Sequence, residues 1–200
     1  MAPLLSWYVP DEIYPSNNEF GIPMLDPAMQ ANGIIGSLKG WSKYSRRQQH
    51  YGTFHFYTKD NRFTALLKHP EAILTSRCQC IIEPNFSTSA MMPRPIALYG
   101  IYWKRWLARF CQTRKIFVIV DLNVNEKFAD DNLLGIPDGW AAFATRVHRS
   151  KEDLVLQHWE QAKAKAMGKH PLFVVYGGGA AIAEQAQSLG WMHVLEEKTI

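Results

Sequence analysis

The stretch "IFVIVD", residues 116–121, is a continuous run of apolar, strand-forming side chains that ends in an acid. A second run of the same character, "LFVVY", occupies residues 172–176. Strands with one solvated face alternate between apolar and polar residues, whereas strands covered on both faces are apolar throughout. The two runs therefore predict an α/β fold with a largely parallel sheet flanked by helices, either open or curled into an incomplete barrel.

Further elements follow from the same patterns. On the strand predicted at 53–57, Phe54 and Phe56 are expected to face inward, with His55 and Tyr57 on the other side. The polar interval 122–139 is too long for a simple turn and is typical of a functional loop. The remaining predicted elements are strands at 78–83, 140–145 and 192–195 and helices at 94–113, 151–168 and 180–189, the second of these with an apolar face of Val155, Trp159, Ala162 and Ala166.

Residues 1–40 contain five prolines and show no lasting periodicity of helix or strand. We expect this segment to wrap irregularly around an α/β domain formed by residues 41–200.

Composition narrows the class of protein. With 47% hydrophobic and 20% charged residues, the chain has the balance of one soluble globular domain. It contains no apolar run of 18 residues and no secretory leader pattern, so we expect a cytoplasmic protein without a membrane partner. The chain has an odd number of cysteines, Cys78, Cys80 and Cys111, without the paired spacing of a zinc site. This argues against a disulfide framework and against zinc, and no metal site is predicted.

Polar residues follow the predicted strands, and ligands of parallel sheets gather where strands end. Among them, Asp60, Glu83 and Asp121 are candidate catalytic acids. The alternative is that polar residues mark strand ends in any protein. The histidines, His55 included, show no metal-ligand spacing and are interpreted as packed or solvated. The other strand-end positions are Asn85, Asn123, Thr145, Arg146 and the glycines at 177–179.

The triple glycine Gly177, Gly178 and Gly179 precedes a predicted helix. A dinucleotide fingerprint would need a small residue at its sixth position, where this chain has Ile182, so that reading is rejected and the cofactor is left open. Exposed backbone N–H groups at a helix start can hold a phosphate or carboxylate. The turn is thus either an anion site or a purely structural bend.

The predicted helix at 94–113 is amphipathic and cationic. Its aromatic side opposes a polar half with Lys104, Arg105 and Arg109. Two readings stay open: a surface that follows a nucleic-acid backbone, or basic residues that only confer solubility. The aromatic side carries Ile96, Tyr99, Trp103, Trp106 and Phe110, and Lys43, Arg46 and Arg47 would join the nucleic-acid surface.

The chain resembles a family carried by phages, plasmids and integrated elements and catalogued as domain of unknown function 4417. The resemblance rests on "GTFHFYTKDNRF", "IIEPNFSTSAMMPRPIALYGIYWKRWLARFCQ" and "LFVVYGG", and spans roughly residues 50–180. This chain has Asn85 where the family usually has aspartate, and "VIVDLNVN" where a strand ending near tryptophan is usual. The resemblance implies a mobile-element context and leaves the mechanism open.

Three functions are compatible with these patterns. The leading hypothesis is a nucleic-acid-associated protein of a phage or plasmid, in replication or processing of DNA. The second is an enzyme that acts on a small phosphorylated metabolite, and the third is a non-enzymatic adaptor or inhibitor of a host protein. Whether the protein is an enzyme at all is left open by the sequence.

Overall fold

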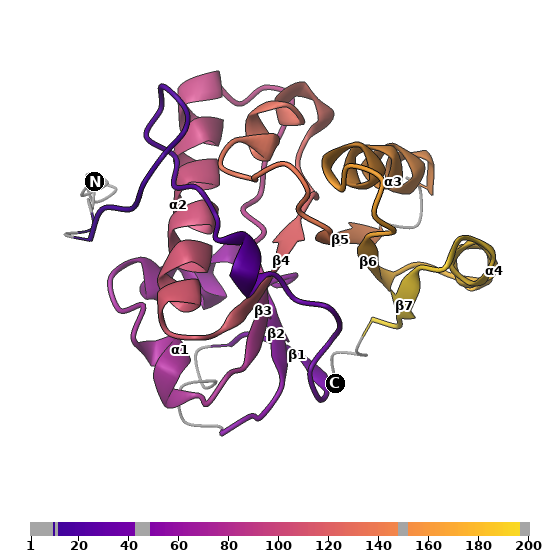
Figure 1. The fold of residues 1–200 in the computed structure, drawn as a ribbon, viewed down its shortest axis with the longest axis horizontal. Helices are drawn as coiled ribbons and strands as arrows, with labels where there is room; N and C mark the ends of the chain where they lie inside the picture. The colour runs from indigo at the N-terminus through magenta and orange to yellow at the C-terminus, as the bar shows by residue number, and fades with distance from the viewer. Residues whose placement is uncertain (1–9, 11, 43–48, 148–151, 197–200) are drawn as a thin grey trace.

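The structure, a computed structural model, describes residue 10 and residues 12–42, 49–147 and 152–196 (Figure 1). The strands are β1 (Leu38–Gly40), β2 (Thr53–His55), β3 (Cys80–Ile82), β4 (Phe117–Asp121), β5 (Ala142–Val147), β6 (Leu172–Gly177) and β7 (Met192–Val194). The α-helices are α1 (Ala72–Thr75), α2 (Arg94–Thr113), α3 (Glu152–Lys165) and α4 (Ala180–Leu189). Short 3-10 helices are η1 (Pro27–Met29), η3 (Asp60–Arg62), η4 (Thr64–Leu67), η5 (Glu126–Phe128) and η6 (Asp131–Leu133).

The seven strands of the described residues are all parallel and neighbour one another in chain order, β1 to β7. The prediction of a largely parallel α/β sheet is confirmed. Its physical basis holds as well, because Val118, Ile119 and Val120 of β4 are all fully buried. β1 and the short α1 were not predicted. β1 has the sequence "LKG", with a single apolar residue, and α1 is one turn of four residues, so neither shows a strand or helix pattern.

The sheet curls into a half-barrel rather than lying open. His55 of β2 and Tyr57 just beyond it contact Tyr176 of β6, with ring centroids 4.4 and 5.3 Å apart. Three strands separate β2 from β6 within the sheet, so these contacts require that the sheet bends around a shared concave face. The incomplete barrel was one of the two expected forms.

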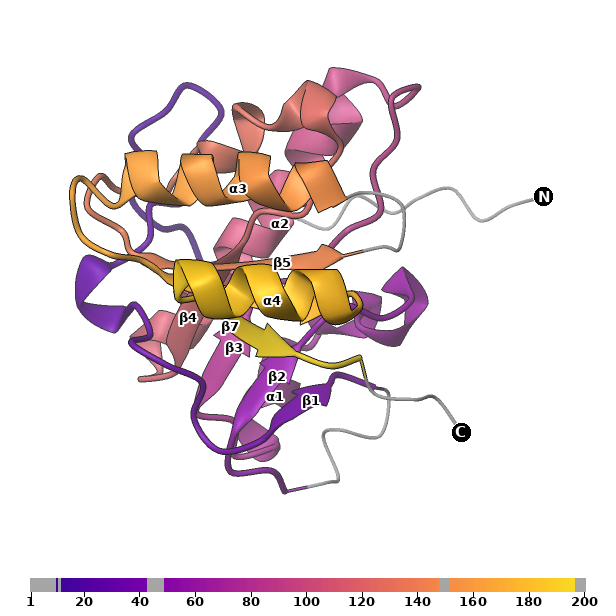
Figure 2. The ribbon, with the colours of Figure 1, turned by 90° about the vertical axis from the view of Figure 1, so that its right-hand side faces the viewer.

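Helices cover the outside of this half-barrel in two groups. Helix α2 lies on the β3–β4 side, and α3 and α4 run next to each other over the β5–β7 side (Figures 1 and 2). The apolar face predicted for α3 is confirmed, because Val155, Trp159, Ala162 and Ala166 are buried. Trp159 packs against Phe173 and Trp191, whose rings lie 5.3 to 5.8 Å apart.

The described part of the N-terminal segment crosses α2 and reaches the sheet (Figure 1). The carbonyl of Glu12 accepts a hydrogen bond from Trp106 Nε1 at 2.8 Å, and Gln30 forms a parallel bridge with Val118. Helix α2 is therefore covered by sheet on one side and by chain segments on others. Among the described helices, none combines the length and the apolar character needed to span a membrane.

Candidate functional site

Asp121, the last residue of β4, lies at the centre of a buried hydrogen-bond network. Its Oδ1 accepts from the Tyr57 hydroxyl at 2.9 Å and from the Asn123 backbone N–H at 3.1 Å. Its Oδ2 accepts from Asn85 Nδ2 at 3.0 Å and from Lys104 Nζ at 3.1 Å. Burial, and then the Asp121 charge, raise the pKa of Tyr57 well above its usual value, so Tyr57 stays a donor. The carboxylate is fully buried and its lone pairs are occupied.

Glu83, which follows β3, is held in the same way. Arg105 Nη1 donates to Glu83 Oε1, and the backbone N–H of Asp121 donates to Oε2 at 3.3 Å. The other arms of Arg105 donate to the carbonyls of Leu134 at 3.0 Å and Asn132 at 2.7 Å. Two of the three predicted acids thus lie side by side, with α2 supplying a cation for each.

The prediction that Lys104 and Arg105 project from a solvated half of α2 is wrong. Both side chains are buried in the ion pairs just described, and Gln112 is buried against the backbone of Asp26. Apolar and charged positions on α2 both face protein, because the N-terminal segment contacts Gln112 and the 122–139 loop contacts Arg105 on the polar half. Neither cation is accessible to a phosphate backbone.

The other cations predicted to contact nucleic acid are not buried in ion pairs of this kind among the described residues. Arg109 remains partly exposed and faces Asp26, with Nη1 and Oδ2 3.7 Å apart. Lys43, Arg46 and Arg47 lie outside the described residues. Their proposed nucleic-acid contacts stay a prediction.

Asp60 is separate from the two buried acids. Its carboxylate accepts from the backbone N–H and the hydroxyl of Ser87, both at 3.1 Å. Ser87 lies two residues beyond Asn85, so Asp60 belongs to the same edge of the sheet but to its outer rim. The sequence predicted all three acids at strand ends, and the structure brings only Glu83 and Asp121 into one network.

The triple-glycine turn closes β6 and starts α4. Gly177 and Gly178 have φ near +86° and +87°, a region that favours glycine. A Cβ on Gly178 would also lie 2.9 Å from Ile182 Cγ1. These demands account for two of the glycines structurally, and the anion role of Gly177, Gly178 and Gly179 stays a prediction.

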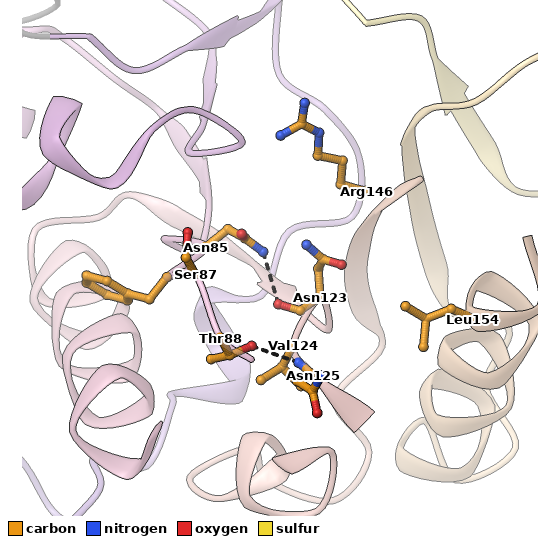
Figure 3. Close-up of a pocket in the computed structure, with 9 residues that line it drawn as sticks. Asn85, Ser87, Thr88, Asn123, Val124, Asn125, Arg146 and Leu154 are labelled. Atoms are coloured by element: carbon orange, nitrogen blue, oxygen red, sulfur yellow. Dashed lines mark hydrogen bonds between the residues drawn. The ribbon is translucent and has the colours of Figure 1, made fainter. Parts of the chain in front are cut away.

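A cavity of about 220 Å³ opens at the carboxyl ends of β3, β4 and β5 (Figure 3). Within the described part of the chain its polar lining consists of amides, hydroxyls and one cation, without a carboxylate. In Figure 3, Arg146 lies at the top, and Thr88 and Asn125 lie at the bottom, joined by a 2.8 Å hydrogen bond. The lining residues are Asn85, Phe86, Ser87, Thr88, Asn123, Val124, Asn125, Arg146 and Leu154.

Arg146, near the end of β5, is the cation of this cavity. Its side chain is 25% exposed, and one arm, Nη2, donates to Glu196, which is itself 49% exposed. Its Nε is buried and has no hydrogen-bond partner among the described residues. The sequence analysis listed Arg146 among the polar residues at strand ends but assigned it no role.

His55 was interpreted from sequence as one of several packed or solvated histidines. It is 2% exposed, and its Nδ1 accepts the Tyr57 backbone N–H at 3.2 Å. Burial, and then the charge of Arg146, lower the pKa of His55 to about 4. The sequence predicted a strand at 53–57, which put His55 in mid-strand, whereas in the structure β2 ends at His55.

These features define the class of protein: a parallel α/β half-barrel with a polar cavity at the carboxyl ends of its strands. The sequence profile of the family described as "Domain of unknown function (DUF4417)" matches residues 14–186, and the chain belongs to this family. The earlier resemblance is thereby confirmed.

One relative of the chain is a phage protein. The chain is 30% identical to the "Gene 1 protein" of Mycobacterium phage D29, over 53% of this chain and 40% of that protein. It therefore spans less than half the length of the phage protein. No solved structure matches the chain.

Proposed function

We propose that the protein binds a small phosphorylated molecule in the cavity at the carboxyl edge of its sheet. The observation that carries this proposal is Arg146, a cation that lines a cavity whose other polar groups are neutral. A guanidinium is suited to phosphate because its N–H groups match two oxygens at once.

The neutral lining supports a small ligand with polar groups besides its phosphate. Three amides, of Asn85, Asn123 and Asn125, can each donate and accept hydrogen bonds. A volume of about 220 Å³ suits a compact molecule rather than a polymer. Glu196 pairs with Arg146 from a half-exposed position, so an incoming phosphate can take its place at modest cost.

Within this proposal, Glu83 and Asp121 position the site rather than react in it. Both are fully buried and do not line the cavity, and each already accepts hydrogen bonds on both oxygens. Asp121 orients Asn85 and Asn123, which do line the cavity. A catalytic role for these acids or for Asp60 would need a rearrangement that frees an oxygen, so we propose binding as the primary function.

The nucleic-acid and host-protein hypotheses remain predictions of the sequence. Burial of Lys104 and Arg105 removes two of the six cations on which nucleic-acid binding was based. The phage relative supports a mobile-element setting for the proposed ligand binding, without naming its chemistry.

The experiment is a thermal-shift screen with inorganic phosphate and with matched pairs, such as glucose 6-phosphate and glucose. We expect phosphorylated members to raise Tm, since a ligand at 100 times its Kd stabilises the fold by about 2.7 kcal/mol. Arg146→Gln should abolish the shift, whereas Arg94→Gln, on an exposed arginine paired with Asp131, should leave it intact.

Absence of any phosphate-dependent shift in the wild-type protein would refute the proposal. Retention on heparin with a steep loss of affinity at higher salt, weakened by Arg109→Ala, would instead favour nucleic-acid binding. We expect no such salt-sensitive retention on heparin.

A further inference from the structure

His55 presents a hydrogen-bond donor at the carboxyl end of β2. Because the backbone N–H of Tyr57 donates to Nδ1, this nitrogen is the unprotonated one. The neutral ring therefore carries its proton on Nε2, and no described residue accepts a hydrogen bond from it. A buried donor left in this state costs about 1–3 kcal/mol, and native proteins rarely tolerate it without purpose.

Arg146 presents a second donor of the same kind on the same concave face. Arg146 pairs with Tyr176 in the β5–β6 register, so their side chains share a face, and the ring of Tyr176 touches that of His55. The charge of the guanidinium, after burial, lowers the pKa of His55. Arg146 Nε, like His55 Nε2, has no acceptor in the described part of the chain.

We infer that His55 Nε2–H and Arg146 Nε–H together bind one anionic oxygen of the phosphorylated ligand. This inference rests on the proposed function, and it adds His55 as a binding residue of that site. It also places the phosphate at the inner, β2-facing side of Arg146 instead of the solvent-facing side.

The chemistry of the two donors selects an anion. Neither nitrogen can accept a hydrogen bond or coordinate a cation, since the guanidinium is always charged and the one in-plane lone pair of the neutral imidazole lies on Nδ1, where Tyr57 donates. The positive charge of Arg146 excludes a cation from the same place. Both nitrogens are buried, and a low local dielectric strengthens a charge-assisted hydrogen bond.

Entry to this position requires that the contact between Arg146 and Glu196 opens. Both donor nitrogens are covered, while Glu196 is half exposed and its pair is of the kind that exchanges readily. Phosphate binding is therefore coupled to release of Glu196 from the guanidinium.

The direct test uses the wild-type protein and inorganic phosphate. Long-range ¹H–¹⁵N NMR of the histidine rings identifies the tautomer of His55 and follows its Nε2 resonance during titration. We expect the Nε2-protonated form before titration, and a saturable downfield shift of its proton as phosphate binds, with the same midpoint as the thermal stabilisation.

A matched pair of variants gives an independent readout. His55→Phe keeps an aromatic ring against Tyr176 and removes the donor, so phosphate affinity should fall roughly 10- to 100-fold. His50→Phe is the control, because His50 is also buried near β2 but its Nε2 already pairs with the carbonyl of Ser37 at 2.9 Å. Its affinity should stay within about twofold of wild type.

The outcomes separate the two proposals. If wild-type protein binds phosphate through Arg146 but the His55 resonance does not respond, the inference about His55 is overturned and the proposed function stands. If phosphate changes neither Tm nor any resonance, both are overturned. The NMR titration needs no variant, so a folding defect of His55→Phe cannot hide the answer.

Discussion

Two arginines at the same edge of the sheet show opposite environments. Arg105 of α2 is fully buried, and its three nitrogens donate to Glu83 and to the carbonyls of Leu134 and Asn132. Arg146 of β5 has one ion pair with a half-exposed acid, and a buried Nε without a partner in the described residues.

The difference shows how charged residues with a structural role can be distinguished from those available to a ligand in this fold. Arg105, with Lys104, neutralises buried acids and ties the loops after β3 and β4 to α2. Its hydrogen-bonding capacity is used within the protein. Arg146 keeps unused capacity at a cavity, which is the arrangement expected of a residue that meets a ligand. The same substitution at both sites should therefore have opposite consequences for stability and binding.

The largest effect is expected for Arg105→Met. It leaves Glu83 buried without its cation, so the free energy of unfolding should fall by about 3–5 kcal/mol in urea titrations. Lys163→Met on α3 is the control, because its pair with Glu160 is 45% and 67% exposed and should hardly matter. Equal losses at both positions would contradict the contrast between buried and exposed pairs.

A second, smaller loss is expected for Asn85→Asp, which introduces the aspartate that the resemblance leads us to expect at this position. The new carboxylate would stand where Nδ2 now donates to Asp121 Oδ2 at 3.0 Å and to the Asn123 carbonyl at 3.0 Å. We expect a loss of roughly 2 kcal/mol at pH 7. The deficit should shrink toward pH 5, because a protonated carboxyl can donate again.

Asn85→Ala serves as the reference for that pH dependence. It removes the same hydrogen bonds without adding a charge, so its deficit should be constant over the range. A pH-independent deficit for Asn85→Asp would show that no repulsion with Asp121 develops.

Per pH unit, a change of similar size is expected from the titration of two buried histidines. Burial lowers the pKa of both His55 and His158 to about 4 in the folded protein, and the unfolded value is near 6.5. Below pH 6.5 the unfolded chain binds more protons, so stability falls as pH drops from 6.5 toward 4. The expected slope is roughly 1 kcal/mol per pH unit for each histidine.

Urea titrations at pH 7, 6 and 5 measure this slope. His158→Phe, which removes a ring hydrogen-bonded to Thr145, and His55→Phe should each reduce the slope by about half. A wild-type stability that stays flat between pH 7 and 5 would contradict the depressed values.

The smallest effect on stability is expected for Arg146→Met. Its ion pair with Glu196 is partly solvated, and the substitution also removes an unsatisfied buried donor, so unfolding should change by less than about 1 kcal/mol. Phosphate stabilisation, in contrast, should disappear. A large stability loss would place Arg146 with Arg105 as a structural cation.

Most of the secondary structure could be predicted from the sequence. Runs such as "FVIV" and "FVVY" carry the signature of strands buried on both faces, and α2 and α4 begin and end at the predicted residues. β1 was not predicted because "LKG" has a single apolar residue, whereas the three-residue strands β2, β3 and β7 lie within longer apolar stretches. Strand order is harder to predict, because nothing local specifies which neighbour a strand will choose.

The candidate site could be predicted only in part. The strand-end rule placed Glu83 and Asp121 correctly at one edge, since parallel strands align their carboxyl ends. It could not tell that both would be saturated by hydrogen bonds. The prediction that Lys104 and Arg105 are solvated failed because helical periodicity indicates only which residues share a face. It does not indicate whether another segment covers that face.

The sequence by itself determined the class of fold, since apolar runs of strand length that alternate with helices leave a parallel sheet as the way to bury both faces. Only the tertiary structure decided which charges are structural and which are available to a ligand. The physical reason is that the state of a charge depends on partners from distant segments, as Arg105 meets Glu83 and Leu134, while Arg146 pairs with the half-exposed Glu196.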